Sequence, residues 1–327
     1  MEPVDTAGPP RQKTSAVALT LLGQLVYFGA TLCGAVALVM LLLALAPGDP
    51  IDLLPNADEV RPELEARWHL DRPLPVRYAL YLGQLATGDL GTSLSYRPGT
   101  PVWEVIARPA MRSAGWLVSA WMLTLIWGSG LAWFTAGRTS VATLLVRVLS
   151  IAPVFLIAHL AVSGFNTAAW SLMEAGTIDR PGWFALPDQP SSLRTALAVV
   201  ILAVGSGALA ELHAEVENAL VALRRSGFVD AARARGMPVW PHVAWNLVSP
   251  LTTIAVSRVA FFVGGLVILE KVLLLNGVGA ILWRAALLRD YDLCLGIALL
   301  AAVVVAGARL TGDGIRITTD PRLRTAR

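Results

Sequence analysis

Long apolar runs alternate with short polar segments along most of this chain. Six runs are apolar enough to cross a bilayer, whose hydrocarbon core of about 30 Å takes roughly 20 helical residues. They cover residues 16–46, 114–136, 141–164, 195–212, 247–269 and 291–308. The first run exceeds the roughly 7 to 15 apolar residues of a secretion signal, so we expect it to remain as an anchor. The pattern predicts an all-α integral membrane protein with six transmembrane helices.

The composition agrees with a membrane protein. Hydrophobic residues make up 55% of the 327 positions and charged residues only 15%, compared with about 25% charged residues in typical soluble domains. The net charge is only +3, and the arginines cluster at the ends of the apolar runs. A nucleic-acid partner is therefore a poor explanation for the basic character, and membrane topology a better one.

The arginines predict the orientation, because short cytoplasmic loops carry an excess of basic residues. Both termini are expected in the cytoplasm, as tails 1–15 and 309–327, and so is the loop 213–246. The long segment 47–113 is expected outside, since its seven arginines are offset by nine acidic residues. The basic residues assigned to the cytoplasmic side are Arg11, Lys13, Arg138, Arg224, Arg225, Arg233, Arg235, Arg309, Arg316, Arg322, Arg324 and Arg327.

The cytoplasmic loop contains a short helix signal within "FVDAARARGMPVWPHVAWNLVSPL", residues 228–251. Residues 228–235 are expected to form a helix that ends at Gly236, a left-handed C′ residue, and Pro238 prevents its continuation. A second helix can restart at residues 238–241, since proline is tolerated in a first turn. The small side chains of Ala231, Ala232 and Ala234 would let another surface approach closely. Polar contacts at the rim could come from Asp230, Arg233 and Arg235. The alternative is an ordinary solvated loop.

Three stretches resemble one family of proteins. "PGDP", "LDRPLPVRY" and "GDLGTSLSYRPGTPVWEVI" in the external segment resemble the signature of permease subunits of ABC importers in the oligopeptide, dipeptide and nickel group. "DAARARG", residues 230–236, resembles the EAA loop of that family, with Asp230 in place of glutamate. Residues 264–299 resemble the fifth span, re-entrant loop and sixth span, and "DPRLR", residues 320–324, the terminal tag. The stretch 155–213 departs from the family, and "NGVG" replaces its usual "PGLG".

The resemblance implies an inner-membrane subunit that forms half of a translocation path for a peptide, a metal chelate or another small solute. It implies a second permease subunit, two ATPase subunits carrying ATP and Mg, and an extracytoplasmic solute-binding protein. No cofactor is implied for this chain. The residues implied to contact an ATPase cleft are Asp230, Ala231, Ala232, Arg233, Arg235 and Gly236.

Two ionisable residues in the spans are further candidates. Glu270 is expected to line the path, or to pair with Lys271 or lie at an interface, because ionisable groups within spans are expensive. Arg258 is expected to face the bundle interior or a partner subunit. No metal site is expected, because the four histidines, His69, His159, His213 and His242, lie in separate segments. Cys33 and Cys294 are interpreted as packing residues.

Other function classes find less support. A phosphate-binding Walker A loop needs a lysine after a glycine-rich turn, and the two lysines, Lys13 and Lys271, follow Gln12 and Glu270. The spans contain neither a Gly-x-Ser-x-Gly elbow nor a His-Glu-x-x-His helix, which disfavours a membrane enzyme. A secondary transporter or channel subunit not driven by ATP remains the alternative, although we find no internal repeat in the sequence.

Overall fold

The computed structural model describes residues 11–45, 51, 58–59, 61–62, 65, 69, 71–135, 140–177, 192–205 and 207–319. The "PGDP" and "DPRLR" matches and Arg138 lie outside the described residues. Regular structure in the described part is helical, with one isolated antiparallel bridge between Thr92 and Pro101. The helices are α1 (Arg11–Leu45), α3 (Leu74–Ala86), α4 (Val102–Thr135), α5 (Val141–Ile151), α6 (Val154–Glu174), α7 (Ser192–Gly205), α8 (Ala208–Arg224), α9 (Gly227–Ala234), α10 (Val239–Val272), α11 (Val278–Leu287) and α12 (Tyr291–Thr319).

Five of the described helices are long and apolar enough to cross a membrane: α1, α4, α6, α10 and α12. The bent pair α7 and α8 makes a sixth candidate when it is counted as one broken span. The all-α membrane fold expected from the sequence is therefore present. Helices α4 and α10 have 34 residues each, longer than the expected spans, because helical hydrogen bonding continues beyond the apolar window that crosses the bilayer.

The span expected at residues 141–164 is divided between two helices. Ala152 has an extended conformation, with ψ of 131°, and precedes Pro153. Proline has no N–H to donate and excludes the helical conformation from the residue before it, so α5 ends here. Helix α5 has only 11 residues, whereas α6 has 21 and is long enough to span. The hydropathy pattern predicted one span here, because an average over many residues is insensitive to a single proline.

The span expected at residues 195–212 is also broken. Helices α7 and α8 meet at an angle of 51°. Gly207 adopts a left-handed conformation, with φ of 73°, which glycine tolerates because it has no Cβ. Helix α8 then continues to Arg224, well past the expected end.

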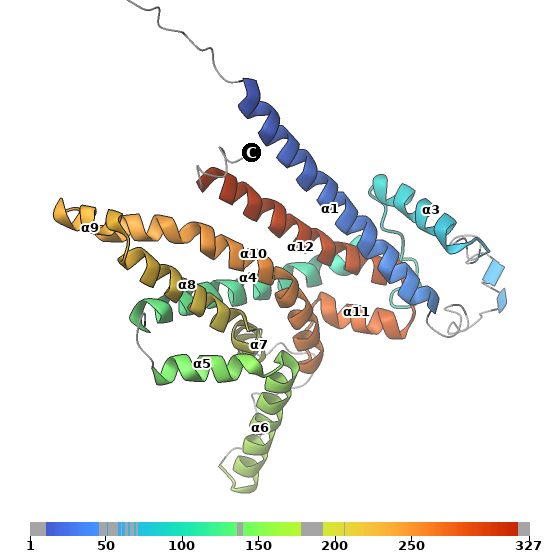
Figure 1. The fold of residues 1–327 in the computed structure, drawn as a ribbon. Helices are drawn as coiled ribbons and strands as arrows, with labels where there is room; N and C mark the ends of the chain where they lie inside the picture. Colours follow the sequence, from blue (N-terminus) through green and yellow to red (C-terminus); the bar gives the residue numbers. More distant parts are fainter. Residues whose placement is uncertain are drawn as a thin grey trace, which may run out of the picture.

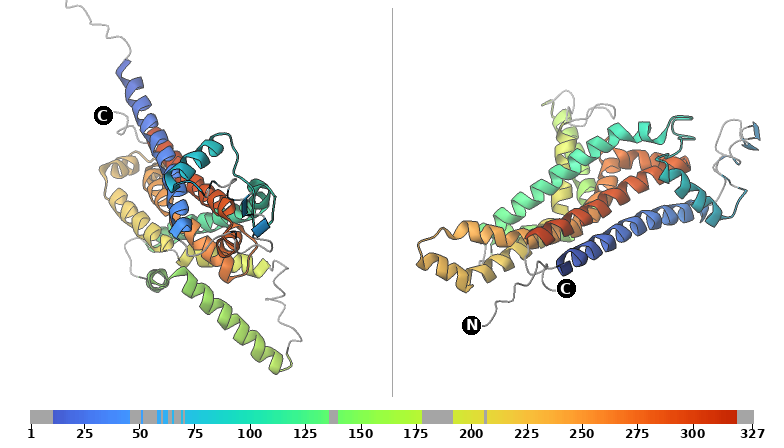
Figure 2. Two further views of the ribbon diagram at one scale, coloured as in Figure 1. Left: turned by 90° about the vertical axis from the view of Figure 1, so that its right-hand side faces the viewer. Right: turned by 90° about the horizontal axis from the view of Figure 1, so that it is seen from above.

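The helices form an elongated bundle with distinct ends (Figures 1 and 2). Helix α9 lies at one end, and α3 and α11 lie toward the other (Figure 1). Helix α1 begins and α12 ends on the side of α9, as the right-hand view of Figure 2 shows. The largest helix contacts are α1 with α12, α4 with α8, and α10 with α12. The loop 225–238 and α3, which belongs to the segment expected outside, therefore lie toward opposite ends of the bundle (Figure 1).

The buried side chains form separate clusters along this axis. A central cluster joins α4, α6, α7 and α10 around Leu202 and Phe262. A second cluster joins α4, α11 and α12 at the α3 end of the bundle. A third joins α4 and α8 to α9 and α10 around Leu220 and Val229. Because the two end clusters share only α4 among their main helices, the ends are built from largely different contacts.

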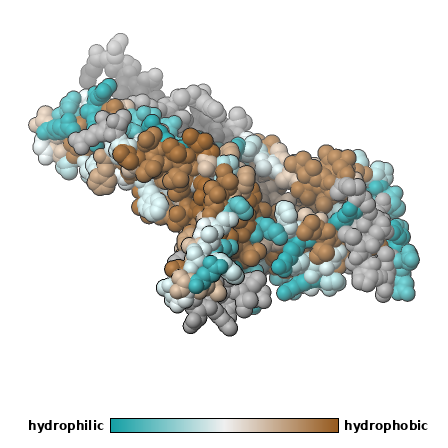
Figure 3. Space-filling view, turned by 90° about the horizontal axis from the view of Figure 1, so that it is seen from below, coloured by the Kyte–Doolittle hydropathy of each residue, from teal (hydrophilic) through white to brown (hydrophobic). Residues whose placement is uncertain are grey.

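The surface is apolar where the spans are expected. Hydrophobic residues cover much of the middle of the face drawn in Figure 3, and hydrophilic residues gather toward its ends. Small residues permit close helix crossings in the interior, as is common in membrane bundles. A side chain at Gly265 would meet Leu202, and one at Gly312 would meet Val256. Such contacts bring α10 close to α7 and α12.

Candidate functional site

Helix α9 is a short helix with a sharply defined end. Gly236 has φ of 68°, as expected for a left-handed C′ residue. Its N–H donates to the carbonyl of Arg233 at 3.0 Å, and the N–H of Met237 donates to the carbonyl of Ala232 at 2.9 Å. These two bonds form a Schellman motif. Pro238 follows as the N-cap of α10, so the predicted helix, stop and restart are confirmed.

One side of α9 packs on the rest of the chain and the other is exposed. Val229 is fully buried against α8 and α10. Ala232, one turn further, is also buried, with 8% of its surface exposed. The other residues expected to contact a partner are exposed, namely Asp230, Ala231, Arg233, Arg235 and Gly236. Ala231 therefore belongs to the free surface, whereas the small size of Ala232 is explained by packing within this chain.

The exposed charges of α9 bind each other weakly. Asp230 and Arg233 lie 3.6 Å apart, with 68% and 58% of their side chains exposed. An ion pair so exposed contributes about 0 to 1 kcal/mol. Both side chains are available to a second surface at little energetic cost.

Two tryptophans link the helices around α9. The rings of Trp133, near the end of α4, and Trp240, at the start of α10, meet edge to face at 4.7 Å. The guanidinium of Arg224, the last residue of α8, lies 5.6 Å from the Trp133 ring. These contacts join the ends of three helices beside α9.

A different arrangement holds the opposite end. The Asp290 side chain is fully buried, and its Oδ2 accepts hydrogen bonds from the Ser93 hydroxyl at 2.6 Å and from the N–H groups of Leu94, Ser95 and Tyr96 at 3.0 to 3.1 Å. Its Oδ1 accepts from the N–H of Leu293 in the first turn of α12 at 3.3 Å. One carboxylate thus binds the loop 93–96 to α12.

A second buried carboxylate joins α10 to α11 and α4. Glu270 is 1% exposed. Its Oε2 accepts from the N–H of Gly279 at 2.6 Å and from that of Ala280 at 3.3 Å, in the first turn of α11. Its Oε1 accepts from the Ser113 hydroxyl of α4 at 2.5 Å. The Ser113 oxygen accepts in turn from the N–H of Val278 at 2.9 Å.

The surroundings of Glu270 leave little free space. A Cβ atom added at Gly277 would collide with the Glu270 carboxylate, and one at Gly279 would collide with the backbone of Val267. Lys271 points elsewhere, because its ammonium lies 5.3 Å from the ring centre of Trp283. Glu270 thus holds α11 against α10 and α4, and its expected position along the path or at an interface stays a prediction.

Arg258, near the middle of α10, forms an ion pair. Its guanidinium contacts the carboxylate of Glu211 on α8 and lies 4.9 Å from the ring centre of Phe261. Its side chain is 19% exposed, whereas that of Glu211 is 50% exposed. Arg258 also lines a small hollow between α4, α8 and α10. The sequence singled out Arg258, but it did not identify its partner.

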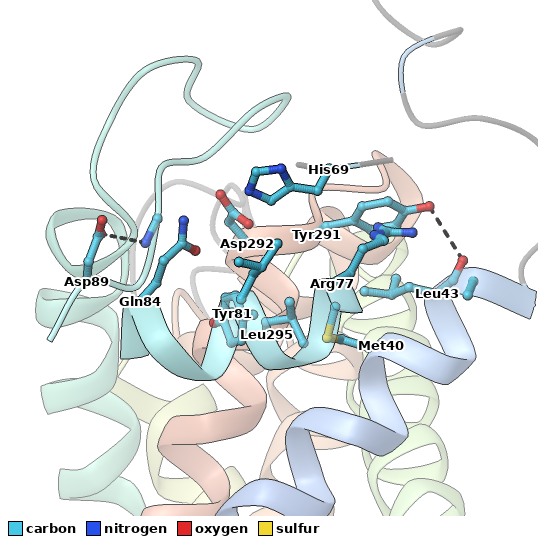
Figure 4. A pocket seen from close by; sticks show the side chains of 13 residues that line it. Met40, Leu43, His69, Arg77, Tyr81, Gln84, Asp89, Tyr291, Asp292 and Leu295 are labelled. Carbon is cyan, nitrogen blue, oxygen red and sulfur yellow. Dashed lines mark hydrogen bonds between the residues drawn. The ribbon is translucent and has the colours of Figure 1, made fainter. Parts of the chain in front are cut away.

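A larger pocket lies at the end of the bundle that holds α3. It is lined by α1, α3 and α12, with Met40, Tyr81 and Leu295 toward its floor and His69 and Asp292 above them (Figure 4). Burial raises the pKa of the Tyr81 hydroxyl, and nearby Asp292 adds to the effect. The hydroxyl of Tyr291 donates to the carbonyl of Leu43 at 3.5 Å, which joins α12 to α1.

Other polar residues have structural partners. The Nε2 atom of buried His213 lies 2.8 Å from the Thr135 hydroxyl, and its Nδ1 lies 3.8 Å from the Glu217 carboxylate. Cys294 is buried and Cys33 partly buried, both as free thiols. Within the described ranges, no three of the residues His, Cys, Asp and Glu come together as a metal site would require.

The sequence overlooked Ser113, Asp290 and Glu211. Ser113 and Asp290 lie in polar positions at the edges of apolar runs, where nothing local marks them. Glu211 had a usable signal, since it is an acidic residue at the end of an apolar run expected to span the membrane.

Comparisons with known proteins agree with this architecture. The profile of a family described as "Binding-protein-dependent transport system inner membrane component" matches residues 123–325, well over half of the chain. A protein of Brucella ovis named as a peptide permease is 29% identical over 301 residues, which cover 88% of this chain and 93% of that protein.

Two further relatives match to similar extents. The di/tripeptide transport system permease protein DppB of Pseudomonas aeruginosa is 28% identical, over 92% of this chain and 96% of its own. The oligopeptide transport system permease protein OppB of Salmonella typhimurium is 26% identical, over 90% and 95%. With its helical membrane bundle and the family profile spanning α4 to α12, this chain belongs to the family of inner membrane components of binding-protein-dependent transport systems.

Proposed function

We propose that the chain is a permease subunit of an ABC importer, forms half of the translocation path for peptides or similar small solutes, and couples to ATPase subunits through α9. The relatives named above support peptides as cargo. The observation that carries the coupling role is α9 itself. It is a capped helix at one end of the bundle, outside the apolar windows, and its exposed side presents Asp230, Ala231 and Arg233.

The partners follow from this assignment. A second permease subunit, most simply a different chain, supplies the other half of the path. Two ATPase subunits carry ATP and Mg, and this chain binds no cofactor and hydrolyses no ATP. A solute-binding protein docks on the side of the external segment 47–113. We assign both termini to the cytoplasm; the start of α1 and the end of α12, which lie on the side of α9 (Figure 2), support this assignment if α9 contacts cytoplasmic ATPases.

The packing of α9 provides a route for coupling. Val229 is buried among Leu220 of α8 and Val243 and Leu247 of α10, so a displacement of α9 must move both helices. When ATP closes the ATPase dimer, α9 moves with its cleft and α8 and α10 tilt. The path then changes from inward-facing to outward-facing. This chain contributes half of the path and the helices that transmit the movement, and it makes or breaks no covalent bond.

Two residues take separate roles within this mechanism. Glu270 keeps α11 fixed to α4 and α10 through its bonds to Ser113 and Gly279. Arg258 is placed with Glu211 on the side of α8 and α10 that faces the path or the second permease subunit.

The coupling role is tested with bulky substitutions on the two sides of α9. Ala231→Trp should leave the chain folded and paired with the second permease, but should abolish co-purification of the ATPase subunits and uptake together. Ala232→Trp should also lower the stability of the chain, because Ala232 is buried. Val76→Trp, at an exposed position of α3, is the matched control and should leave ATPase recruitment unchanged. Normal recruitment and uptake by Ala231→Trp would refute the proposal.

A second experiment separates this function from a transporter or channel that does not use ATP. The complex is reconstituted in vesicles with and without its ATPase subunits, and uptake of a labelled dipeptide is measured. We expect uptake only with the ATPases and ATP inside the compartment that represents the cytoplasm. Uptake that persists without them and collapses with the ion gradient would support the alternative.

The orientation is tested with single cysteines at exposed positions in a variant lacking Cys33 and Cys294. Pro98→Cys in the external loop and Ala234→Cys in α9 should react with an impermeant thiol reagent from opposite sides of the membrane. Reaction of both from one side would contradict the six-span arrangement.

A further inference from the structure

Helix α8 carries an exposed face with two carboxylates and an amide. Before its last residue, Arg224, its exposed residues are Glu211, Glu215, Asn218 and Ala222, spaced by four, three and four positions, so they lie on one side of the helix. The opposite side is buried and largely apolar, with Leu212, Val216 and Leu220 in the core. We call the four exposed residues the α8 polar face.

The α8 polar face begins at membrane depth. Helix α8 follows α7 in a bent pair that is apolar enough to count as one broken span, and Glu211 lies in the first turn of α8. Its partner Arg258 lies near the middle of α10, a helix of 34 residues. At a rise of 1.5 Å per residue, Arg258 is roughly 20 Å from the end of α10 at Val272. Two full charges are therefore held within the spanning part of the bundle.

Hydrocarbon is a poor environment for this face. A charged side chain near the centre of a bilayer costs about 2.5 to 3.5 kcal/mol even on insertion scales. Half of the Glu211 side chain is exposed despite its contact with Arg258, and Glu215 is exposed one turn further. Four exposed positions of α10 nearby are small or polar, namely Thr253, Ser257, Ala260 and Gly264, and the exposed Phe261 ring lies against the Arg258 guanidinium. This side of α8 and α10 therefore faces water or a polar surface.

The lipid-exposed character of other spans gives the contrast. The exposed residues of α1 include Leu38, Leu41, Leu42 and Leu45. The exposed side of α1 thus presents branched apolar side chains, which suit hydrocarbon, whereas α8 presents carboxylates and an amide.

A simpler explanation for Glu211 is insufficient. An acidic residue in the first turn of a helix interacts favourably with the helix dipole, by about 0.3 to 1 kcal/mol. That effect needs no arginine from another helix, and it does not account for Glu215 or Asn218 on the same side. The pairing with Arg258 and the continuous polar face require a further reason.

We propose that Glu211 and Arg258 line the solute path and determine which charges pass along it, an inference that rests on the proposed function. The free side of the Glu211 carboxylate meets an ammonium group of the passing peptide. The Arg258 guanidinium meets a carboxylate. A peptide carries an ammonium group at one end and a carboxylate at the other. A path lined by one acidic and one basic residue therefore suits it better than a path lined by charges of a single sign. The exposed Phe261 ring beside Arg258 offers apolar contact to side chains.

Removing one charge of the pair should change the selectivity of uptake. In vesicles holding the complete complex, the rates are compared for Ala-Lys, Ala-Ala and Ala-Glu. Glu211→Gln should lower the ratio of Ala-Lys to Ala-Glu uptake about fivefold, as expected for one partly exposed charge contact of about 1 kcal/mol. Arg258→Gln should raise that ratio by a similar factor. The exchange Glu211→Arg with Arg258→Glu should return the ratio toward that of the wild type.

The matched control is Glu104→Gln, at an exposed position of α4 near the external loop, which should leave the ratio unchanged. An equal loss of uptake for all three dipeptides in the Glu211 and Arg258 variants would show that the pair only supports the fold, and would overturn the inference.

A second measurement does not depend on the cargo. In a variant lacking Cys33 and Cys294, Glu211→Cys should react with a small hydrophilic thiol reagent, whereas Leu42→Cys on the exposed apolar side of α1 should stay unreacted. If both are inert, Glu211 does not line an aqueous path and the inference is wrong. If Glu211→Cys reacts but the wild-type complex takes up no dipeptide, the proposed peptide cargo fails while the aqueous position of Glu211 stands.

Discussion

The two ends of the bundle are held together in opposite ways. At the α3 and α11 end, two buried carboxylates, Asp290 and Glu270, bind the loop 93–96, α11, α12 and α4 through many hydrogen bonds. At the other end, the side chains of α9 that the structure describes as buried are Val229 and Ala232, and a Schellman motif at Gly236 ends the helix. Its charged residues pair only weakly at the surface.

The difference teaches how rigidity is distributed in this subunit. A buried carboxylate that accepts several hydrogen bonds fixes its donors, since breaking the set would leave charge and donors unsatisfied away from water. The external end should therefore move as one body. The contacts of α9 are few and mostly solvent-exposed, which is typical of elements that open at low energetic cost. We therefore expect faster hydrogen exchange around α9 than at the opposite end, while the burial of Val229 still joins α9 to α8 and α10.

The largest effect is expected from Asp290→Ala. It leaves the donors of Ser93, Leu94, Ser95 and Tyr96 without their acceptor, and we expect a loss of at least about 3 kcal/mol in the free energy of unfolding. The apparent melting temperature in detergent should fall by about 6 °C or more. Asp230→Ala, at the opposite end, is the matched control and should change stability by less than about 1 kcal/mol. Equal shifts in the two variants would remove the contrast between the ends.

A smaller loss is expected from Glu270→Ala, about 2 kcal/mol, because three donors from two elements lose their acceptor. Glu270→Gln should recover part of this loss, since the amide oxygen can still accept from the N–H of Gly279. Thermal unfolding of both variants in detergent gives the comparison. A Gln variant as unstable as the Ala variant would mean that the charge itself is required.

The close approach of α11 to α10 gives the next prediction. Gly279→Ala places a Cβ against the backbone of Val267 and should cost about 1 to 2 kcal/mol by overpacking. Gly264→Ala is the control, because nothing lies within 4 Å of its added Cβ. It should be neutral or slightly stabilising, as alanine is favoured over glycine in a helix. Melting curves that rank the two variants in the reverse order would contradict the described packing.

The smallest effect on global stability concerns the end of α9. Gly236→Ala must hold a left-handed conformation at φ of 68°, which costs roughly 1 kcal/mol. Since α9 is attached by few contacts, hydrogen exchange at Gly236 and Met237 should speed up by about fivefold while the melting temperature barely changes. Gly227→Ala, at the start of α9 with open space around it, should show neither effect. A large fall in melting temperature for Gly236→Ala would show that α9 is part of the rigid body.

The features that the sequence alone could determine are those controlled by nearby residues. The all-α membrane fold follows from apolar runs whose length matches a bilayer, and the end of α9 follows from Gly236 and Pro238, because a C-cap involves only a few consecutive residues. The break at Pro153 was equally available from the sequence, since proline terminates a helix through local sterics. A window that averages hydropathy does not record it.

Tertiary structure alone decided what the ionisable residues do. Ser113 reaches Glu270 across 157 positions of the chain, and Ser93 reaches Asp290 across 197. The same holds for Arg258 and Glu211, which belong to different helices. The sequence indicated that each charged residue in a span must have a partner or a function that offsets its cost of desolvation. Glu270 anchors α11, whereas Arg258 pairs with a carboxylate on an exposed polar face. The difference depends on which distant donors and acceptors the folded helices bring within hydrogen-bond distance.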